Sequence, residues 1–133
     1  MRRLLLIIVI VMAPCYLMAQ NFEALGKPKE DVRRLSKSML YITKTETDTC
    51  DVYSLLGEMK VLFFYKAGIC SKIENVFLLS YKDSFVAALN HEGNLIGENT
   101  WTIDDGAIKV RLTTVEEKNQ FILDISSVAQ NAH

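Results

Sequence analysis

Residues 59–79 read MKVLFFYKAGICSKIENVFLL, and this stretch decides the fold of the chain. Apolar side chains recur at every second position on either side of Gly68, which is the period of a β-strand with one buried face. That face is predicted to hold the odd-numbered residues Met59, Val61, Phe63, Tyr65, Ile69, Ile73, Phe77 and Leu79. The stretch therefore predicts an antiparallel hairpin whose odd-numbered side chains enter the core.

The turn of this hairpin is chosen by its register. A two-residue loop at Ala67 and Gly68 would set odd-numbered residues against even-numbered ones. A three-residue loop that includes Lys66 sets Val61 against Ile73 instead, and it places Gly68 where such loops need a left-handed residue. We therefore expect the three-residue loop.

Helical periodicity marks two other segments. The first has Pro28 at its first helical position, acidic residues in its first turn, and runs to about Leu40. The second begins at Ser80, which forms a capping box with Asp83, and ends at Gly93. Both segments are predicted to be amphipathic helices that cover a sheet.

Alternating patterns predict further strands outside the hairpin. They lie at residues 41–47, 51–56, 98–103, 108–114 and 121–125. Asp105-Gly106 is a strong hairpin signal that sets Ile103 against Ile108. A second turn, at Glu117-Lys118, then sets Leu112 against Leu123.

The predicted elements make one α+β domain, with an antiparallel sheet of six to seven strands and both helices on one face. The order of a helix followed by strands occurs twice. When Val32 and Leu35 are aligned with Val86 and Leu89, the strands that follow each helix also align, and each half reads as an α-β-β-β unit. A divergent duplication would explain this order, and so would the general similarity of amphipathic elements.

The first 19 residues have the features of a secretory signal peptide. Arg2-Arg3 precedes an apolar run from Leu4 to Met12, and Leu17-Met18-Ala19 is an acceptable cleavage site. An uncleaved anchor is the alternative, but the apolar segment is shorter than the roughly 20 residues of a spanning helix. We therefore expect residues 1–19 to be a signal peptide. Residues 20–133 would then be one exported domain, periplasmic or secreted, that is not inserted in the membrane.

The charge balance bears on the partners of the chain. The full sequence has 15 basic and 16 acidic residues, and removal of Arg2 and Arg3 with the leader leaves a net charge of −3. This balance gives no reason to expect nucleic acid or an anionic membrane surface as a partner.

Two cysteines, Cys50 and Cys70, remain after the leader. In the predicted strand order they flank the strand 59–66 from opposite sides, about 9–10 Å apart, whereas a disulfide reaches about 7 Å between Cα atoms. We therefore expect free thiols, and a disulfide would require a different strand order.

No motif in the chain assigns a chemistry. His91 and His133 lack the spacing of metal ligands, and the cysteines form no paired CxxC. Carboxylates beside Cys50 would raise the pKa of its thiol, so they do not make a nucleophile. The chain has no G-x-S-x-G, P-loop or G-x-G-x-x-G motif. We predict no catalytic residue, metal site or cofactor; an enzyme is disfavoured, not excluded.

The other face of the hairpin carries the functional prediction. Its apolar members are Leu62, Phe64, Val76 and Leu78, among Lys60, Lys66, Lys72 and Glu74. An apolar group rimmed by charge on a polar sheet face is typical of a surface where a protein partner or a second copy docks. The alternative is that the N-terminal segment, with Phe22 and Leu25, folds over these side chains.

The segment Gly26-Lys27-Pro28-Lys29-Glu30-Asp31-Val32 leads into a helix and then a meander. It resembles the G-x-[ST]-x-x-x-V opening of the BamE and SmpA/OmlA group, with Pro28 in place of the small hydroxyl residue. The α-β-β-β order is also similar to the β-lactamase-inhibitor-protein architecture and, more loosely, to small exported proteins of Gram-negative anaerobes. The resemblance implies a periplasmic protein-binding accessory without catalysis.

These observations favour a small exported, non-enzymatic binding module that uses a sheet face or edge to hold a protein partner or a second copy. The alternative is a carrier or small enzyme with a pocket between the helices and the sheet.

Overall fold

The structure is a computed structural model that describes residues 22–37 and 41–128. The predicted signal peptide lies outside the described residues. The helices are α3 (Lys29–Ser36) and α4 (Lys82–Glu92), and the strands are β1 (Tyr41–Glu46), β2 (Cys50–Leu55), β3 (Lys60–Lys66), β4 (Ile69–Leu78), β5 (Asn94–Gly97), β6 (Thr100–Ile103), β7 (Ile108–Val115) and β8 (Gln120–Ser127).

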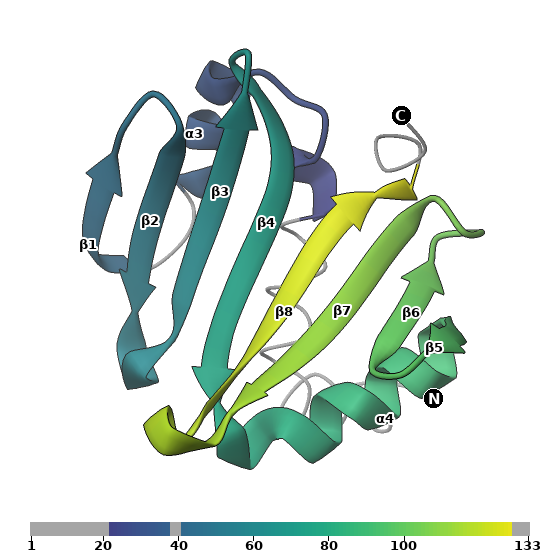
Figure 1. Ribbon diagram of the computed structural model, residues 1–133. Coiled ribbons are helices and arrows are strands. Elements are labelled where there is room, and N and C mark those ends of the chain that lie inside the picture. The colour runs from purple at the N-terminus through teal and green to yellow at the C-terminus, as the bar shows by residue number, and fades with distance from the viewer. Residues whose placement is uncertain (1–21, 38–40, 129–133) are drawn as a thin grey trace, which may run out of the picture.

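All eight strands form one antiparallel sheet in the order β1-β2-β3-β4-β8-β7-β6-β5. Two four-stranded meanders meet where β4 pairs with β8 (Figure 1). The α+β class is confirmed, but the sheet has one strand more than the six to seven predicted. The strand that was not predicted is β5, which has only four residues, Asn94–Gly97. A strand this short does not show a recognisable alternation of apolar and polar residues.

Both helices pack on the same face of the sheet. Arg33 of α3 binds Asp51 of β2, and Phe85 of α4 stacks on Phe77 of β4 with ring centroids 4.6 Å apart. In Figure 1, α3 lies behind the first meander and α4 runs along the lower end of the second. The opposite face, which neither helix covers, is called the open face below.

The central hairpin turns by a different loop from the one predicted. Lys66 pairs with Ile69, so the loop has two residues, Ala67 and Gly68. Their φ angles are 53° and 78°. This left-handed pair matches the right-handed twist of the strands, which is why such loops favour glycine.

A β-bulge then restores the predicted inner face. The register shifts after Phe64, where Ser71 is the extra residue of β4, so that Phe63 pairs with Ile73. Both of these side chains are buried, as predicted. The predicted pairing of Val61 with Ile73 was wrong by two residues.

The bulge also reverses the expected burial of two side chains at the start of β4. Cys70 is completely buried, whereas Ile69 is 36% exposed. Uninterrupted alternation through the return strand predicts Ile69 in the core, and this prediction was wrong. A bulge breaks that alternation at one residue.

The segment before α3, residues 22–28, is called the lead-in here and extends the sheet beside β4. Gly26 donates its backbone N–H to the carbonyl of Cys70 at 2.8 Å, and the Cys70 N–H donates to the carbonyl of Lys27 at 2.9 Å. It occupies the edge that β8 leaves free, because β8 pairs with β4 only from Lys72 onward. Phe22 and Leu25 pack against the core, so this segment does not fold over the open face.

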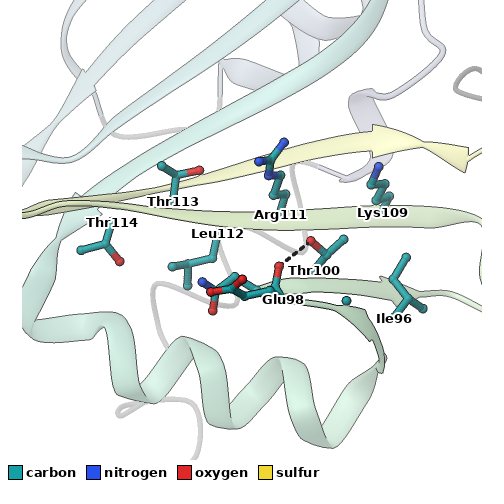
Figure 2. Close-up of a pocket in the computed structure, with 10 residues that line it drawn as sticks. Ile96, Glu98, Thr100, Lys109, Arg111, Leu112, Thr113 and Thr114 are labelled. Atoms are coloured by element: carbon teal, nitrogen blue, oxygen red, sulfur yellow. Dashed lines mark hydrogen bonds between the residues drawn. The ribbon is translucent and has the colours of Figure 1, made fainter.

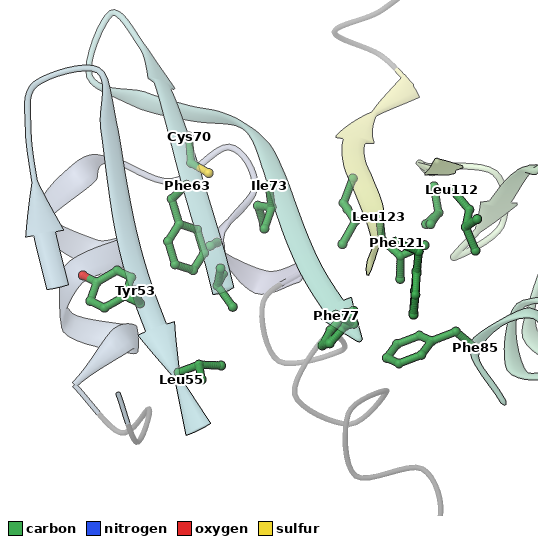
Figure 3. Close-up of a cluster of buried hydrophobic side chains, with 14 of the residues drawn as sticks. Tyr53, Leu55, Phe63, Cys70, Ile73, Phe77, Phe85, Leu112, Phe121 and Leu123 are labelled. Carbon is green, nitrogen blue, oxygen red and sulfur yellow. The ribbon is translucent and has the colours of Figure 1, made fainter. Parts of the chain in front are cut away.

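The core lies between the helices and the sheet (Figure 3). Under α3 it holds Tyr53, Phe63 and Ile73, and near α4 it holds an aromatic cluster. In this cluster Phe85 contacts Phe77 and Phe121, with ring centroids 4.6 and 5.5 Å away. Such aromatic contacts add to the free energy of apolar burial.

The turns of the second meander have the predicted register. Ile103 pairs with Ile108, and Leu112 pairs with Leu123. The predicted capping box is not formed: Ser80 lies in a short 3₁₀ turn (Leu79–Tyr81), and α4 begins with no side-chain cap.

Gly93 ends α4 as predicted, but it does not have the left-handed conformation of a helix-capping glycine. Its φ angle is −125°, which is outside the left-handed region. A β-carbon at this position would lie 2.6 Å from the carbonyl oxygen of Thr102 and 2.7 Å from the side chain of Ile103. Glycine is therefore required because the end of α4 approaches β6 too closely for a side chain.

Candidate functional site

The structure places all four predicted patch residues, Leu62, Phe64, Val76 and Leu78, on the open face. Each is partly buried. They do not form a single cluster, because Leu62 faces Glu74 across the strands and Phe64 faces Lys72. The apolar surface is therefore divided by charged residues into two groups.

The first apolar group lies on β2 and β3. Val52 pairs with Leu62, and Cys50 pairs with Phe64. The ammonium group of Lys72 lies 4.6 Å from the centre of the Phe64 ring, in the geometry of a cation–π contact. This group combines an aromatic surface with an adjacent positive charge.

The second apolar group lies where the meanders join. Val76 of β4 pairs with Ile122 of β8, and Leu78 follows on the same face of β4. Ile122 was not predicted to join this group, because the pairing of β4 with β8 joins residues far apart in the chain.

A charged centre separates the two apolar groups. Glu74 forms a salt bridge of 3.2 Å with Lys72, and Asp124 lies directly across from it. The pKa of Asp124 is raised to about 6, chiefly by burial and then by the hydrogen bond and negative charge of Glu74. Lys72 and Arg111 act in the opposite direction. The two carboxyl groups therefore disfavour each other's ionised form where β4 pairs with β8, which is called the seam below.

A hollow of about 530 Å³ lies beside this centre, along β7 (Figure 2). It exists because β6 begins at Thr100, opposite Arg111, whereas β7 continues to Val115. Figure 2 shows Lys109, Arg111 and Thr113 projecting from one side of β7, with Thr100 on the neighbouring strand. Glu98 in the β5–β6 turn is an acidic residue of its lining.

A second polar cluster lies on the helix side of the sheet. Arg33 donates hydrogen bonds of 3.0 and 2.9 Å to the two carboxylate oxygens of Asp51, and Tyr65 donates one of 2.6 Å. Asp51 is completely buried. Burial raises the pKa of Tyr65, so this hydroxyl stays a donor. These hydrogen bonds hold α3 against β2.

The two thiols are free, as predicted. Cys50 pairs with Phe64 on the open face, whereas Cys70 pairs with Tyr65 on the buried face. Burial raises the pKa of Cys70 to about 12 and also raises the pKa of Cys50. Neither thiol is thus held as a reactive thiolate.

The described residues include no group of three or more His, Cys, Asp or Glu side chains placed to hold a metal ion. His91 is exposed near the end of α4. His133 lies outside the described part of the chain. Among the described residues, no helix has both the length and the apolar character needed to cross a bilayer.

Comparison of the chain with protein-family models, with curated proteins and with solved structures finds no match. The resemblance to the BamE and SmpA/OmlA group therefore stays a prediction.

Proposed function

We propose that this chain is an exported, non-enzymatic binding module whose open face holds a protein partner. One observation carries the proposal. The helices and the lead-in with Phe22 and Leu25 pack on the other face, and they leave Leu62, Phe64 and Val76 partly exposed beside charged residues. Apolar surface with a charged border is typical of protein interfaces.

The size of the open face fits this role. Eight strands about 4.8 Å apart, with about 3.3 Å per residue along each strand, span on the order of 800 Å² on one face. One partner contributes about 800 Å² to an interface of standard size. The sheet thus supplies enough surface without any contribution from its edges.

The alternative function, a carrier or enzyme with a pocket between helices and sheet, has weaker support. The space under α4 is filled by Phe85, Phe121 and Trp101, each almost fully buried. The hollow beside β7 lies at the β5–β6 turn and not under a helix. A small molecule retained by the purified chain would favour this alternative.

The proposal includes an origin by divergent duplication. Each half has a helix followed by a four-stranded meander, and the two halves pair through their last strands, β4 and β8. A repeated unit that pairs with itself in this way closes one edge of each copy.

The test is the substitution Phe64→Asp, studied in the chain purified from the cells that make it. Native mass spectrometry should show a protein partner on the unchanged chain and none on the variant, because the new carboxylate would be buried in the interface without a partner. Thermal unfolding should remain cooperative, because Phe64 points away from the core.

The matched control is Leu95→Asp, the same kind of change at an exposed residue of the edge strand β5. Association should survive this change. Association that persists in Phe64→Asp, or that is lost in Leu95→Asp, would contradict docking on the open face.

A further inference from the structure

The open face differs in charge from the rest of the molecule. Its strands present five basic residues, Lys60, Lys66, Lys72, Lys109 and Arg111, and two acidic ones, Glu74 and Asp124. The other described residues include eight basic and fourteen acidic side chains. A net positive face therefore lies on an otherwise negative molecule, which attracts a negatively charged partner to this face.

Two of the cations, Lys109 and Arg111, form no salt bridge within the described part of the chain. Arg111 lies across from Asp124, where its charge lowers the pKa of that carboxyl. Both cations line the hollow beside β7, together with the hydroxyl-bearing Thr113 and the acidic Glu98, whereas the Thr100 hydroxyl already donates to the Glu98 carbonyl at 2.9 Å. The N–H groups of two cations, with the Thr113 hydroxyl, are donors that carboxylate groups accept from, and the single carboxylate of Glu98 leaves the lining with a net positive charge.

A second copy of the chain and a nucleic acid both fit this face less well than an acidic polypeptide does. A symmetric dimer through this face would set its positive charges against the same charges of the second copy. A nucleic acid would bring its phosphates against the carboxyl groups of Glu74 and Asp124 at the centre of the face. It would also find few aromatic side chains for its bases, because the described strands present one aromatic residue, Phe64, on this face.

We propose that the partner is an acidic polypeptide segment that places carboxylate side chains in the hollow at Lys109 and Arg111 and an apolar side chain on Phe64. The inference rests on the proposed function, because it assumes that the open face is the docking surface. It adds the chemistry of the partner and the position of its charges.

The strand register gives the spacing that the segment must have. Phe64, Lys72, Ser126 and Lys109 form one row across β3, β4, β8 and β7. Phe64 and Lys109 are thus three strand spacings apart, about 14 Å, which an extended chain covers in about four residues. A bound segment that crosses the strands would carry its acidic pair about four residues from an apolar anchor.

The test uses a short fluorescent peptide with a glutamate pair four residues from a phenylalanine in a serine background. Its binding to the purified chain is measured by fluorescence anisotropy. It should bind at least about tenfold tighter than a peptide with lysine for glutamate or alanine for phenylalanine, and salt should weaken it. Equal binding of the lysine peptide would overturn the inference.

Variants locate the charge requirement. The double substitution Lys109→Glu with Arg111→Glu should weaken peptide binding by at least about tenfold. The matched control, Lys82→Glu with Lys118→Glu, changes the same net charge away from the face and should leave binding nearly unchanged. Equal effects of the two pairs would overturn the inference, as would tighter binding to single-stranded DNA or to phosphatidylglycerol vesicles than to the peptide.

The outcomes separate this inference from the proposed function. If Phe64→Asp abolishes association with the natural partner but Lys109→Glu with Arg111→Glu does not, the acidic partner is wrong and the docking face stands. If Phe64→Asp has no effect, the docking face itself is wrong.

Discussion

The two halves of the molecule have the same order of elements, but different interactions position their helices on the sheet. In the second half, α4 buries Phe85 and Leu89 against an aromatic cluster. In the first half, the shorter α3 buries Val32 as its apolar residue and relies on the pairing of Arg33 with Asp51. Apolar burial grows with the area of a helix face. A short helix that lacks this area is positioned here by directional hydrogen bonds instead.

The halves also differ on the open face. The first half presents Val52, Leu62 and Phe64 beside three lysines and Glu74, whereas the second half presents Lys109, Arg111 and Thr113. The aromatic part of the proposed docking surface therefore lies in the first half, and the hollow with its two cations lies in the second.

The largest expected effect comes from breaking the aromatic cluster. Phe85→Ala removes a ring that is 1% exposed and contacts two other rings, so the free energy of unfolding should fall by about 4 kcal/mol. Urea denaturation measures this. Val86→Ala on the same helix, at a partly buried position, should cost about 1 kcal/mol. A loss below about 1 kcal/mol for Phe85→Ala would show that packing does not hold α4.

The next effect comes from the ion pair that fastens α3. Arg33→Met leaves the Asp51 carboxylate buried without its cation, and unfolding should become easier by about 3 kcal/mol. Adding Asp51→Asn removes the buried charge and should recover part of this loss, which urea denaturation of the double variant measures. If Asp51→Asn recovers nothing, charge is not what positions α3, and the contrast between the helices fails.

The smallest effect concerns the seam between the halves. The pKa of Asp124 is raised from 3.8 to about 6, first by burial and then by Glu74. The folded chain therefore holds a proton that the unfolded chain releases, and stability is lost as the pH rises from about 4 to about 6. Asp124→Asn should stabilise the chain by about 1 kcal/mol near pH 7.5, after a discount for partial solvent exposure.

Thermal unfolding at several pH values tests this. The gain from Asp124→Asn should vanish below about pH 4, where the carboxyl is protonated in both states. Glu74, Lys72 and Arg111 surround this carboxyl, so Lys72→Met should increase the penalty. A gain that does not depend on pH would show that Asp124 is not protonated at the seam.

Short-range features of the fold were predictable from the sequence. The hairpins at Asp105-Gly106 and Glu117-Lys118 have the predicted register, because turn residues and alternation lie within a few positions of each other. The turn at Ala67-Gly68 was missed for an equally local reason. Alternation at both ends of the hairpin was compatible with a three-residue loop and with a two-residue loop followed by a bulge, and the pattern does not distinguish them.

The candidate site was predictable only in part. Alternation on β3 and β4 placed Leu62 and Phe64 on the face away from the core. The approach of Asp124 to Glu74 was not predictable, because α4 and strands β5, β6 and β7 lie between β4 and β8 in the chain. The hollow at Lys109 and Arg111 depends on where β6 ends relative to β7, which single-sequence patterns locate poorly.

The sequence by itself determined which side chains share a face, because that property follows from the two-residue period of a strand and from nearby turns. Tertiary structure decided which strands became neighbours, and so where charges such as Asp124 and Glu74 meet. It also decided that Gly93 must lack a side chain and that Asp51 is neutralised by Arg33. These outcomes depend on contacts between distant segments, whose free energy is gained only when the whole sheet has formed.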